Sequence, residues 1–526
     1  MTNSQPWWQR AVIYQLLVPT YYDSNGDGLG DLVGVTSKLE YLQWIGVDAV
    51  WLSPIYDSPF LEMGYDPSNF VDVNPRFGTL EDFDALLEEA HRRDLRVILD
   101  WVPNHTSSEH PWFKASRSAR NDPRRDWYVW QDPKPDGSPP NNWISVFGGS
   151  AWEYDEKTGQ YYLHTFLEEQ PDLNWWNPEV RDAVLDAMRF WLDRGVDGFR
   201  LDALDLVIED PDYPDNPPNP EYDPEADAPD MSVVHEYTRN QPTIHEIVIE
   251  MRRLVDEYDD RVLLGELYLH IEEIATYYGE EDPELHLPLN PTFGLIPWEA
   301  DELFEAIDGA LTCSPEDGWP SWMLSTHDGV RVATRAGAAQ APVAAMMLMT
   351  LRGTPILYYG DEIGMEDAEI PPEKERDPQG KRIGRKRDPV RTPMQWNDWI
   401  HAGFSTADPW LPAAENFSEV NVQMQSDGPS LLNLYRALIR LRREEPALGN
   451  GSCSLVEAGD SVISYWRDSD GGRMLVALNL TGEDQTFDAG EGGGVVRLST
   501  YLDREGEVLH DGVTLRPDEG LVISYS

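Results

Sequence analysis

Cysteine is nearly absent from this sequence: its 526 residues include only Cys313 and Cys453. Two cysteines so far apart exclude the disulfide framework of a small secreted domain, and we expect a reducing compartment. Long apolar runs are also missing, because no stretch approaches the roughly 20 apolar residues of a membrane-spanning helix. The first residues, MTNSQPWWQRAVIYQ, have neither the basic start nor the apolar core of a secretory signal. The sequence therefore predicts a cytoplasmic protein without a membrane partner.

Positive charge is scarce. Lys and Arg together number 41 against 95 Asp and Glu, which gives a formal net charge of −54. Such a polyanion repels nucleic acid and anionic membranes, so we expect neither as a partner. Only seven of the 41 cations are lysines. Many acids with few lysines keep a protein hydrated when high salt screens charge repulsion. We expect a salt-adapted source, with an acidic protein of ordinary origin as the alternative.

Short apolar runs alternate with helical patterns over most of the chain. The apolar content of 40% and aromatic content of 11% are typical of a globular protein. The alternation predicts parallel β/α units, and eight strands are the number that closes a TIM barrel. The expected strands are residues 11–16, 49–54, 96–102, 198–202, 262–266, 286–290, 322–327 and 354–359.

Capping residues mark two of the intervening helices. Thr79 can cap a helix with Asp82 three residues later, which completes a capping box. Asn177 precedes Pro178 at the first position of another helix, and Gly195 is placed to end that helix. These signals fall between expected strands, as a β/α barrel requires.

The alternation breaks in two places. Some seventy residues rich in Trp, Pro, Gly and Asn follow the third strand. This is too long for an ordinary loop and predicts a subdomain over the barrel mouth. Near the C-terminus, short alternating strands with Gly and Asp turns predict an antiparallel β-sandwich. The expected parts are 1–103 and 177–454 for the barrel, 104–176 for the inserted subdomain and 455–526 for the C-terminal β domain.

Two unusual loops follow barrel strands. Residues 205–230, rich in Pro and Asp, follow the fourth strand, and the charged residues 365–390 follow the eighth. Loops after strands rim the mouth of a TIM barrel, where its active site lies. A plain surface loop remains the alternative for 205–230.

Acidic side chains stand at the C-terminal ends of four expected strands. In a barrel these ends converge on one face, and carboxylates gathered there, with histidines beside them, suit glycoside hydrolysis. The acids are Asp100, Asp202, Glu266 and Asp328, and the histidines are His105 and His327.

The sequence resembles the α-amylase family of glycoside hydrolases, within it the oligo-1,6-glucosidase and α-glucosidase group, over essentially its full length. The motifs that carry the resemblance are DWVPNHTS at 100–107, QPDLN at 170–174, GFRLDALD at 198–205, GEL at 265–267, STHD at 325–328, GTPILYYGDEIGM at 353–365 and RTPMQW at 391–396. The resemblance implies a catalytic barrel, a second domain inserted after the third strand and a C-terminal β domain.

By this resemblance Asp202 is the nucleophile, Glu266 the general acid/base and Asp328 the third carboxylate, which binds sugar hydroxyls. A retaining enzyme needs two carboxyl groups about 5–5.5 Å apart, one ionised and one protonated. Glu266 lies among apolar strand residues, which favour its neutral form. Arg200 is two residues before Asp202 on the same side of the strand, so we expect it to hold Asp202 ionised.

The resemblance also implies the sugar-binding residues of a closed pocket. Tyr65 is expected to stack on glucose and Asp66 to bind its hydroxyls. Arg387 is expected to pair with Asp66 and to close the end of the pocket. Such an enzyme removes single glucose units from a non-reducing end.

Histidines and aromatic residues complete the expected pocket. His105 and His327 stand where the family donates hydrogen bonds to glucose hydroxyls. Phe147 and Phe166, in the inserted segment, either line the cleft or pack in the core of the subdomain.

Oxygen-bearing residues alternate in the loop after the first strand. This spacing resembles the first half of a calcium loop, without the final glutamate of an EF-hand. In the resembled group the loop holds a structural Ca²⁺ or Mg²⁺ away from the catalytic acids, and an acidic turn without metal is the alternative. The expected ligands are Asp23, Asn25, Asp27, the carbonyl of Leu29, and Asp31.

The residue after the nucleophile bears on the substrate. In the resembled group valine there accompanies α-1,6 cleavage, and Ala203 leaves more room beside the scissile bond. We therefore expect a monomeric α-glucosidase, without organic cofactor, that acts on maltose and short α-1,4 oligosaccharides and also transfers glucose. An α-1,6-specific glucosidase and a sugar isomerase (trehalose or isomaltulose synthase) remain alternatives.

Overall fold

Eight parallel strands form the centre of the computed structural model, which describes residues 5–525 except 458, 460, 488–492 and 511. The strand order is β11-β10-β9-β5-β2-β1-β13-β12. Ser321 Oγ of β12 donates a 2.8 Å hydrogen bond to Pro288 O of β11, so the two ends of the sheet meet and close a barrel. All eight expected strands are confirmed: β1 (Ile13–Leu16), β2 (Ala49–Leu52), β5 (Arg96–Trp101), β9 (Gly198–Leu201), β10 (Val262–Glu266), β11 (Leu287–Leu289), β12 (Ser321–Met323) and β13 (Thr354–Tyr358).

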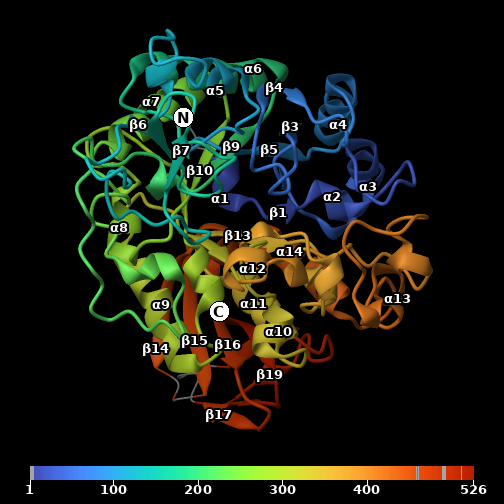
Figure 1. Cartoon of the computed structure of the whole chain (residues 1–526). Coiled ribbons are helices and arrows are strands. Elements are labelled where there is room, and N and C mark those ends of the chain that lie inside the picture. The colour runs from blue at the N-terminus through green and yellow to red at the C-terminus, as the bar shows by residue number, and fades with distance from the viewer. Residues whose placement is uncertain (1–4, 458, 460, 488–492, 511, 526) are drawn as a thin grey trace.

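Helices follow these strands and cover the outside of the barrel (Figure 1). The larger ones are α3 (Leu32–Ile45), α4 (Leu80–Arg92), α6 (Pro178–Arg194), α7 (Ile244–Val255), α9 (Ala300–Cys313), α11 (Ala341–Thr350) and α14 (Leu431–Glu444). The shorter ones are α1 (Trp7–Arg10), α2 (Val18–Tyr21), α5 (Pro111–Ser116), α8 (Ile271–Thr276), α10 (Val332–Ala336), α12 (Pro378–Ile383), α13 (Val422–Gln425) and α15 (Pro446–Asn450).

The capping predictions are confirmed. Thr79 accepts a hydrogen bond from the backbone N–H of Asp82 at the start of α4, and the Asp82 side chain bonds back to the backbone of Thr79. Asn177 caps α6, and Gly195 ends it in the left-handed region with φ 101°.

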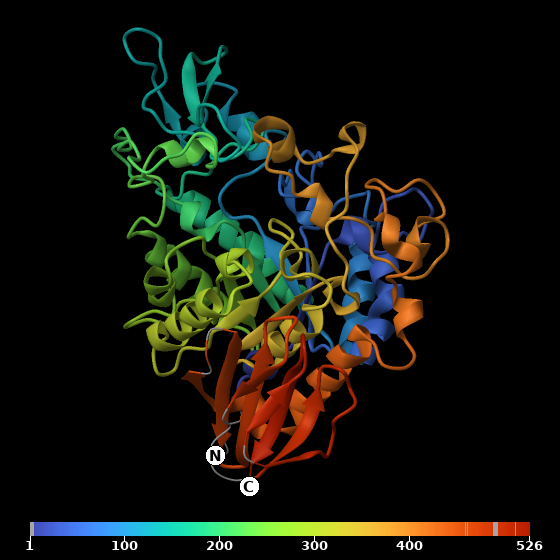
Figure 2. The ribbon, with the colours of Figure 1, turned by 90° about the horizontal axis from the view of Figure 1, so that it is seen from below.

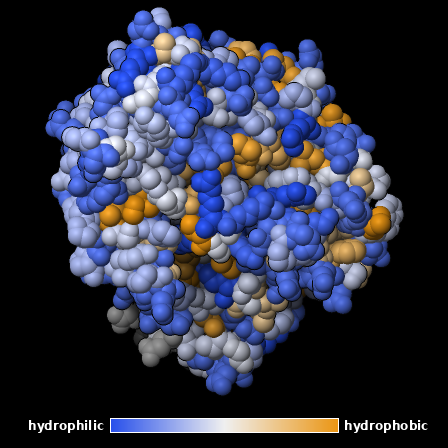
Figure 3. Space-filling model, viewed as in Figure 1, coloured by the Kyte–Doolittle hydropathy of each residue, from blue (hydrophilic) through white to orange (hydrophobic). Residues whose placement is uncertain are grey.

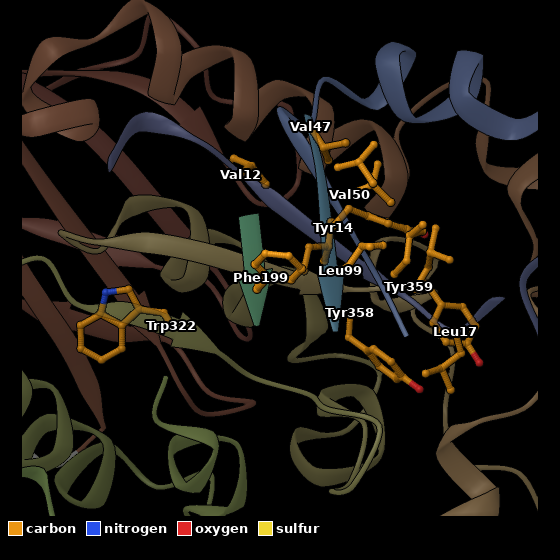
Figure 4. Packing of buried hydrophobic residues seen from close by; sticks show 14 of the residues in the cluster. Val12, Tyr14, Leu17, Val47, Val50, Leu99, Phe199, Trp322, Tyr358 and Tyr359 are labelled. Atoms are coloured by element: carbon orange, nitrogen blue, oxygen red, sulfur yellow. The ribbon is translucent and has the colours of Figure 1, made fainter. Parts of the chain in front are cut away.

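Side chains alternate between two cores along each barrel strand, because successive residues of a strand point to opposite faces. Leu99 and Phe199 point outward and pack beneath the helices with residues such as Val50 and Tyr14 (Figure 4). Ile98 belongs instead to the small apolar cluster inside the barrel, with residues such as Ile13, Trp51, Val262 and Leu264. Polar residues two positions after an inward residue therefore also point inward, toward the mouth of the barrel.

The segment between β5 and α6 forms its own small layer. Its strands β6 (Trp130–Gln131), β8 (Gln160–Leu163) and β7 (Trp152–Asp155) form an antiparallel sheet in that order. A further antiparallel pair, β3 (Tyr56–Asp57) and β4 (Asn69–Val73), follows β2. The inserted layer, cyan in Figures 1 and 2, lies at the end of the molecule opposite the C-terminal sheet.

The C-terminal region is a six-stranded antiparallel sheet in the order β14-β15-β16-β21-β18-β19, and β17 pairs with β20 as a separate ribbon. Val513 and Leu515 of that ribbon share an apolar cluster with the sheet, and this second layer makes the expected sandwich a small one. The opposite face packs on α11, where the hydroxyls of Thr350 and Tyr465 are 2.6 Å apart. The strands are β14 (Ser452–Glu457), β15 (Val462–Ser469), β16 (Gly472–Asn479), β17 (Gln485–Phe487), β18 (Gly494–Ser499), β19 (Val508–Leu509), β20 (Val513–Leu515) and β21 (Gly520–Tyr525).

Both cysteines are free thiols. Among the described residues, no helix is both long enough and apolar enough to cross a membrane.

Candidate active site

The expected catalytic acids meet at the C-terminal ends of the barrel strands. Asp202 directly follows β9, Glu266 is the last residue of β10, and Asp328 follows β12. Asp100, Asp202 and Glu266 come two residues after the inward positions 98, 200 and 264, so the pleat directs all three into the barrel mouth. All three are buried.

Arg200 is the cation around which these acids are arranged. Its Nη1 lies 2.7 Å from Asp100 Oδ1 and 2.6 Å from Asp202 Oδ1, and its Nη2 pairs with Glu266 Oε1. Arg200 itself is fully buried. One guanidinium therefore holds the carboxyl groups of residues 202 and 266 beside each other. The expected pairing of Arg200 with Asp202 is present, and the structure adds that Asp100 and Glu266 share the same charge.

Burial sets the ionisation of this group. Burial raises the pKa of Glu266, Arg200 lowers it and the neighbouring Asp202 and Asp328 charges raise it, and together these effects bring it to about 8. Burial also raises the pKa of Asp202, to about 7, against the lowering effect of Arg200. Burial therefore favours the neutral form of Glu266, as its apolar neighbours predict. Asp202 is nevertheless not held ionised as strongly as the sequence suggested, since Arg200 cannot neutralise all its partners.

Asp328 is the acid that remains ionised. Its Oδ1 accepts hydrogen bonds from Arg387 Nη1 at 3.1 Å and Arg391 Nη2 at 2.7 Å. Burial would raise the pKa of Asp328, but His327 and the two guanidinium groups lower it well below its ordinary value. A fixed negative charge therefore faces the other acids across the site.

Ala203 connects the turn after Asp202 to the carboxyl group of Glu266. Its φ of 44° and ψ of 44° are left-handed, so the chain turns sharply after Asp202. The backbone N–H of Ala203 donates a 3.0 Å hydrogen bond to Glu266 Oε2. The conformation favours a small side chain, because a β-branched residue is strained at positive φ.

Tyr65 and His327 lie together in the site. The hydroxyl of Tyr65 is 2.8 Å from His327 Nε2 and donates a 2.9 Å hydrogen bond to Asp100 Oδ2. Their rings are nearly parallel, with an interplanar angle of 10°. Burial lowers the pKa of His327 to about 3, so this histidine is neutral at physiological pH.

Arg387 pairs with Glu62 and not with Asp66, which corrects the expected contact. Arg387 Nη2 lies 2.9 Å from Glu62 Oε1 and 2.7 Å from Asp377 Oδ1. Asp66 instead accepts hydrogen bonds from Ser58 Oγ at 2.7 Å and from the backbone N–H of Leu61 at 2.9 Å. Asp66 is fully buried and stabilises its own turn, so Glu62 takes its place as the acid beside the catalytic group.

The inserted segment supplies one wall of the site. His105 Nε2 is 2.7 Å from the carbonyl of Tyr65, and its ring packs against Phe166 with centroids 5.1 Å apart. Phe166 also contacts Phe147, and the guanidinium of Arg387 lies 5.2 Å from the centroid of the Phe147 ring. Burial lowers the pKa of His105 to about 4, so it too is neutral.

The loop expected to bind metal satisfies much of its negative charge internally. Asp23 accepts hydrogen bonds from the backbone N–H groups of Gly26 and Gly28, at 2.7 and 2.8 Å. Asp31 caps α3 through the N–H of Gly34, at 2.6 Å. Asn25 and Asp27 likewise accept from the backbone two residues on. In the part of the chain that the structure describes, no three Asp, Glu, His or Cys side chains form a group that could hold a metal, so this site stays a prediction.

Three polar residues of the site were not expected from the sequence: Glu62, Asp377 and Gln170. Gln170 Nε2 donates to Glu62 Oε2 at 2.7 Å, while Asp377 holds Arg387 from the loop after β13. Gln170 opens the QPDLN motif and Glu62 lies two residues before Gly64-Tyr65, so both stood inside or beside recognised segments. Asp377 gave no signal, because its contact depends on the path of a long loop.

Comparison with known proteins identifies the family. The family model "Alpha amylase, catalytic domain" matches residues 15–451. A probable alpha-glucosidase of Rhizobium meliloti (strain 1021) is 42% identical over 91% of this chain and 90% of its own length. An oligo-1,6-glucosidase of Heyndrickxia coagulans is 38% identical over 94% of this chain and 96% of its own.

Solved structures agree over nearly the entire chain. An alpha-glucosyl transfer enzyme, XgtA, is 39% identical with a TM-score of 0.94, and the match covers 99% of this chain and 100% of that one. A variant of the trehalulose synthase MutB in complex with sucrose is 33% identical with a TM-score of 0.92 and the same coverage. The fold, the acids at the strand ends and these similarities together show that the chain belongs to the α-amylase family of glycoside hydrolases, among relatives named as α-glucosidases and oligo-1,6-glucosidases.

Proposed function

We propose that this protein is a retaining, exo-acting α-glucosidase that releases glucose from the non-reducing end of maltose and short α-1,4-linked oligosaccharides and also transfers glucose to other hydroxyl groups. The single observation that carries the proposal is the Arg200 guanidinium, which contacts the carboxyl groups of both Asp202 and Glu266. Retaining glycosidases need two neighbouring carboxyl groups, because one must attack the anomeric carbon while the other protonates the departing oxygen.

The roles are those that the family resemblance implies for the matching residues. Asp202, which has Arg200 as its partner, attacks the anomeric carbon and forms a covalent glucosyl ester. Glu266 gives its proton to the departing oxygen and then takes a proton from the incoming water or hydroxyl group. Asp328 keeps its charge and binds glucose hydroxyls near the developing positive charge of the ring.

A closed pocket end supports the exo mode. Arg387 bridges Asp328 and Glu62, and it has a side-chain exposure of only 11%. A chain of several sugars cannot continue through this buried ion-pair group, so the bound glucose is the terminal one.

Ala203 supports the α-1,4 preference. Its left-handed backbone favours a side chain without a branched Cβ, which leaves space beside the scissile bond. A one-residue difference of this kind discriminates by only about 1–3 kcal/mol. Relatives named oligo-1,6-glucosidase and glucan 1,6-alpha-glucosidase make α-1,6 cleavage the alternative linkage.

A sugar isomerase is the second candidate, because trehalulose synthase MutB shares the fold over 99% of this chain. In such an enzyme the released sugar, and not water, would capture the glucosyl ester.

Initial rates on maltose, isomaltose, sucrose and trehalose, with products identified by NMR, test the proposal. We expect maltose to be hydrolysed fastest, with α-glucose as the first anomer, and Asp202→Asn to lose at least about 10³-fold in kcat. Faster hydrolysis of isomaltose would reverse the linkage assignment. An isomerised disaccharide as the main product would replace hydrolysis with isomerisation, and β-glucose as the first product would overturn the retaining mechanism.

A further inference from the structure

Gln15 is a buried polar residue of the barrel that has no part in the roles above. It lies on β1 two residues after Ile13, which belongs to the inner apolar cluster, and is 1% exposed. Its Nε2 is 2.9 Å from His327 Nδ1. Within the described part of the chain, its Oε1 has no hydrogen-bond partner. The amide therefore faces the histidine with its nitrogen and leaves a carbonyl oxygen unsatisfied, which costs free energy and calls for an explanation.

The direction of the neighbouring hydrogen bonds can be derived from Asp100. Its Oδ1 receives Arg200 Nη1 at 2.7 Å, and its Oδ2 receives Trp51 Nε1 at 3.1 Å. Arginine and indole N–H groups only donate, so both oxygens of Asp100 act as acceptors. The hydroxyl of Tyr65, 2.9 Å from Oδ2, must therefore give its single proton to Asp100.

The ring of His327 is fixed by the same reasoning. Since the proton of Tyr65 is committed to Asp100, the oxygen of Tyr65 can only accept from His327 Nε2, 2.8 Å away. Asp328 Oδ2, 3.1 Å from the same nitrogen, is likewise an acceptor. A lone pair on Nε2 would face two oxygens, so the proton sits on Nε2. In the neutral ring Nδ1 is then an acceptor, and it requires a donor from the other side.

We propose that Gln15 is a positioning residue for the glycosidase reaction: its amide N–H fixes His327 in the tautomer that carries the proton on Nε2, and that proton holds Tyr65 and Asp328 in the geometry that receives the substrate. The role in catalysis rests on the proposed function, whereas the proton arrangement does not. The unsatisfied Oε1 is the consequence, because turning the amide would place the carbonyl oxygen against the Nδ1 lone pair and leave both acceptors without a donor.

Histidines that bind metals indicate how much activity the loss of the Gln15 hydrogen bond should cost. Partners that fix the tautomer of metal-binding histidines change affinity or activity about 10–100-fold when removed. Because Asp328 is proposed to bind the sugar more strongly as positive charge develops in the transition state, loss of the N–H that holds it should lower kcat more than it raises KM.

Histidine-selective ¹⁵N NMR of the wild-type protein tests the proton arrangement directly. The His327 signals are assigned by their disappearance in His327→Asn. We expect Nδ1 of His327 to be unprotonated and Nε2 protonated at pH 7. A proton on Nδ1 would overturn the proposal without any change to Gln15.

Two substitutions test the causal step. Gln15→Leu removes the donor, and we expect a mixture of tautomers and a fall in kcat/KM of about 10–100-fold. Gln15→Glu keeps the size but supplies an acceptor, and we expect it to draw a proton onto Nδ1 with a loss at least as large. The matched control is Gln340→Leu, because Gln340 is also buried but hydrogen-bonds to Trp298 of the barrel and to Asp518 of the C-terminal domain, away from the candidate site. That variant should retain wild-type kcat/KM and the His327 spectrum.

The possible outcomes distinguish a failure of the proposed role of Gln15 from a failure of the proposed glycosidase function. An unchanged His327 spectrum in both Gln15 variants would overturn the positioning role. A changed spectrum with unchanged kcat/KM would overturn the catalytic consequence. Inactivity of the wild-type protein on every α-glucoside would instead count against the proposed function, while the NMR result would still decide which nitrogen carries the proton.

Discussion

Glu62 and Asp66 illustrate what single residues could and could not be predicted from the sequence. Both acids flank Gly64-Tyr65, and composition alone offers no reason to prefer either as the partner of Arg387. Gly64 has φ 101°, and the turn it makes brings Asp66 back onto the N–H groups of Leu61 and Glu62. The backbone N–H groups thus claim Asp66 and leave Glu62 for Arg387. The geometry of this turn decides which acid pairs with Arg387, and the spacing of residues in the sequence does not show that geometry.

Arg200 shows the same limit for electrostatics. The position of Asp202 and Glu266 at strand ends was predictable, since the pleat fixes which residues point inward. The sharing of one guanidinium among three acids depends on distances between strands, and these determine how far each pKa moves.

The proton affinity of Glu266 leads to a pH prediction. In the proposed mechanism Glu266 must be protonated to release the leaving group, and burial raises its pKa to about 8. Below that pH the acid is present, and as pH rises through it the acid is lost. We therefore expect kcat/KM for maltose to fall on the alkaline side with an apparent pKa near 8, measured by initial rates from pH 5 to 10.

Glu266→Gln provides the matched comparison, because it removes the proton but keeps the shape. It should lose most activity on maltose yet retain glucosylation by α-glucosyl fluoride, whose leaving group needs no acid, and the alkaline fall should vanish with that substrate. An alkaline limb that persists in Glu266→Gln would assign the limb to another group.

At the scale of elements, all eight barrel strands were predictable because each is a short apolar run, whereas their ends were not. The run at 322–327 leaves the ladder after Met323, and the released residues carry His327 and Asp328 into the site. Where a strand ends early at the barrel mouth, the residues after its last ladder hydrogen bond can enter the active site. The apolar pattern of the sequence does not show where the ladder ends.

The loop 23–31 carries a prediction at this scale. Asp23 and Asp31 are buried, and no Lys or Arg side chain of the described residues forms an ion pair with either. Backbone N–H groups offset part of this negative charge, and we propose that Ca²⁺ or Mg²⁺ bound by Asp23, Asn25, Asp27, the Leu29 carbonyl and Asp31 offsets the rest.

A chelator tests that ion. We expect EDTA to lower Tm in calorimetry and added Ca²⁺ or Mg²⁺ to restore it, because a ligand that binds only the folded state stabilises it. Asp27→Asn should weaken the response, and Asp136→Asn, on an exposed turn elsewhere, should not. Equal Tm with and without EDTA, with no metal in elemental analysis, would show that the loop is an acidic turn without metal.

At the scale of the whole molecule, the charge of −54 is spread over a surface that hydrophilic residues dominate (Figure 3). Ion pairs such as Arg504 with Glu519 and Arg516 with Asp503 neutralise part of it locally. With 95 acids and 41 cations, at least 54 acids have no cation of their own. Their mutual repulsion opposes the compact state and is the term that dissolved salt can remove.

Salt weakens the repulsion between the surface acids by screening their charges. The Debye length falls from about 10 Å at 0.1 M salt to about 3 Å at 1 M, so repulsion between neighbouring surface acids is largely lost at molar salt. We expect Tm to rise with KCl up to molar concentration and to rise similarly with NaCl. The exposed acids Asp223, Glu225 and Asp227 lie together in the loop after β9, and their triple change to Asn, Gln and Asn should raise Tm in dilute buffer more than in 2 M KCl. A Tm that stays flat or falls with salt would mean that ion pairs, which salt weakens, outweigh the repulsion, and the protein would then be acidic without being salt-adapted.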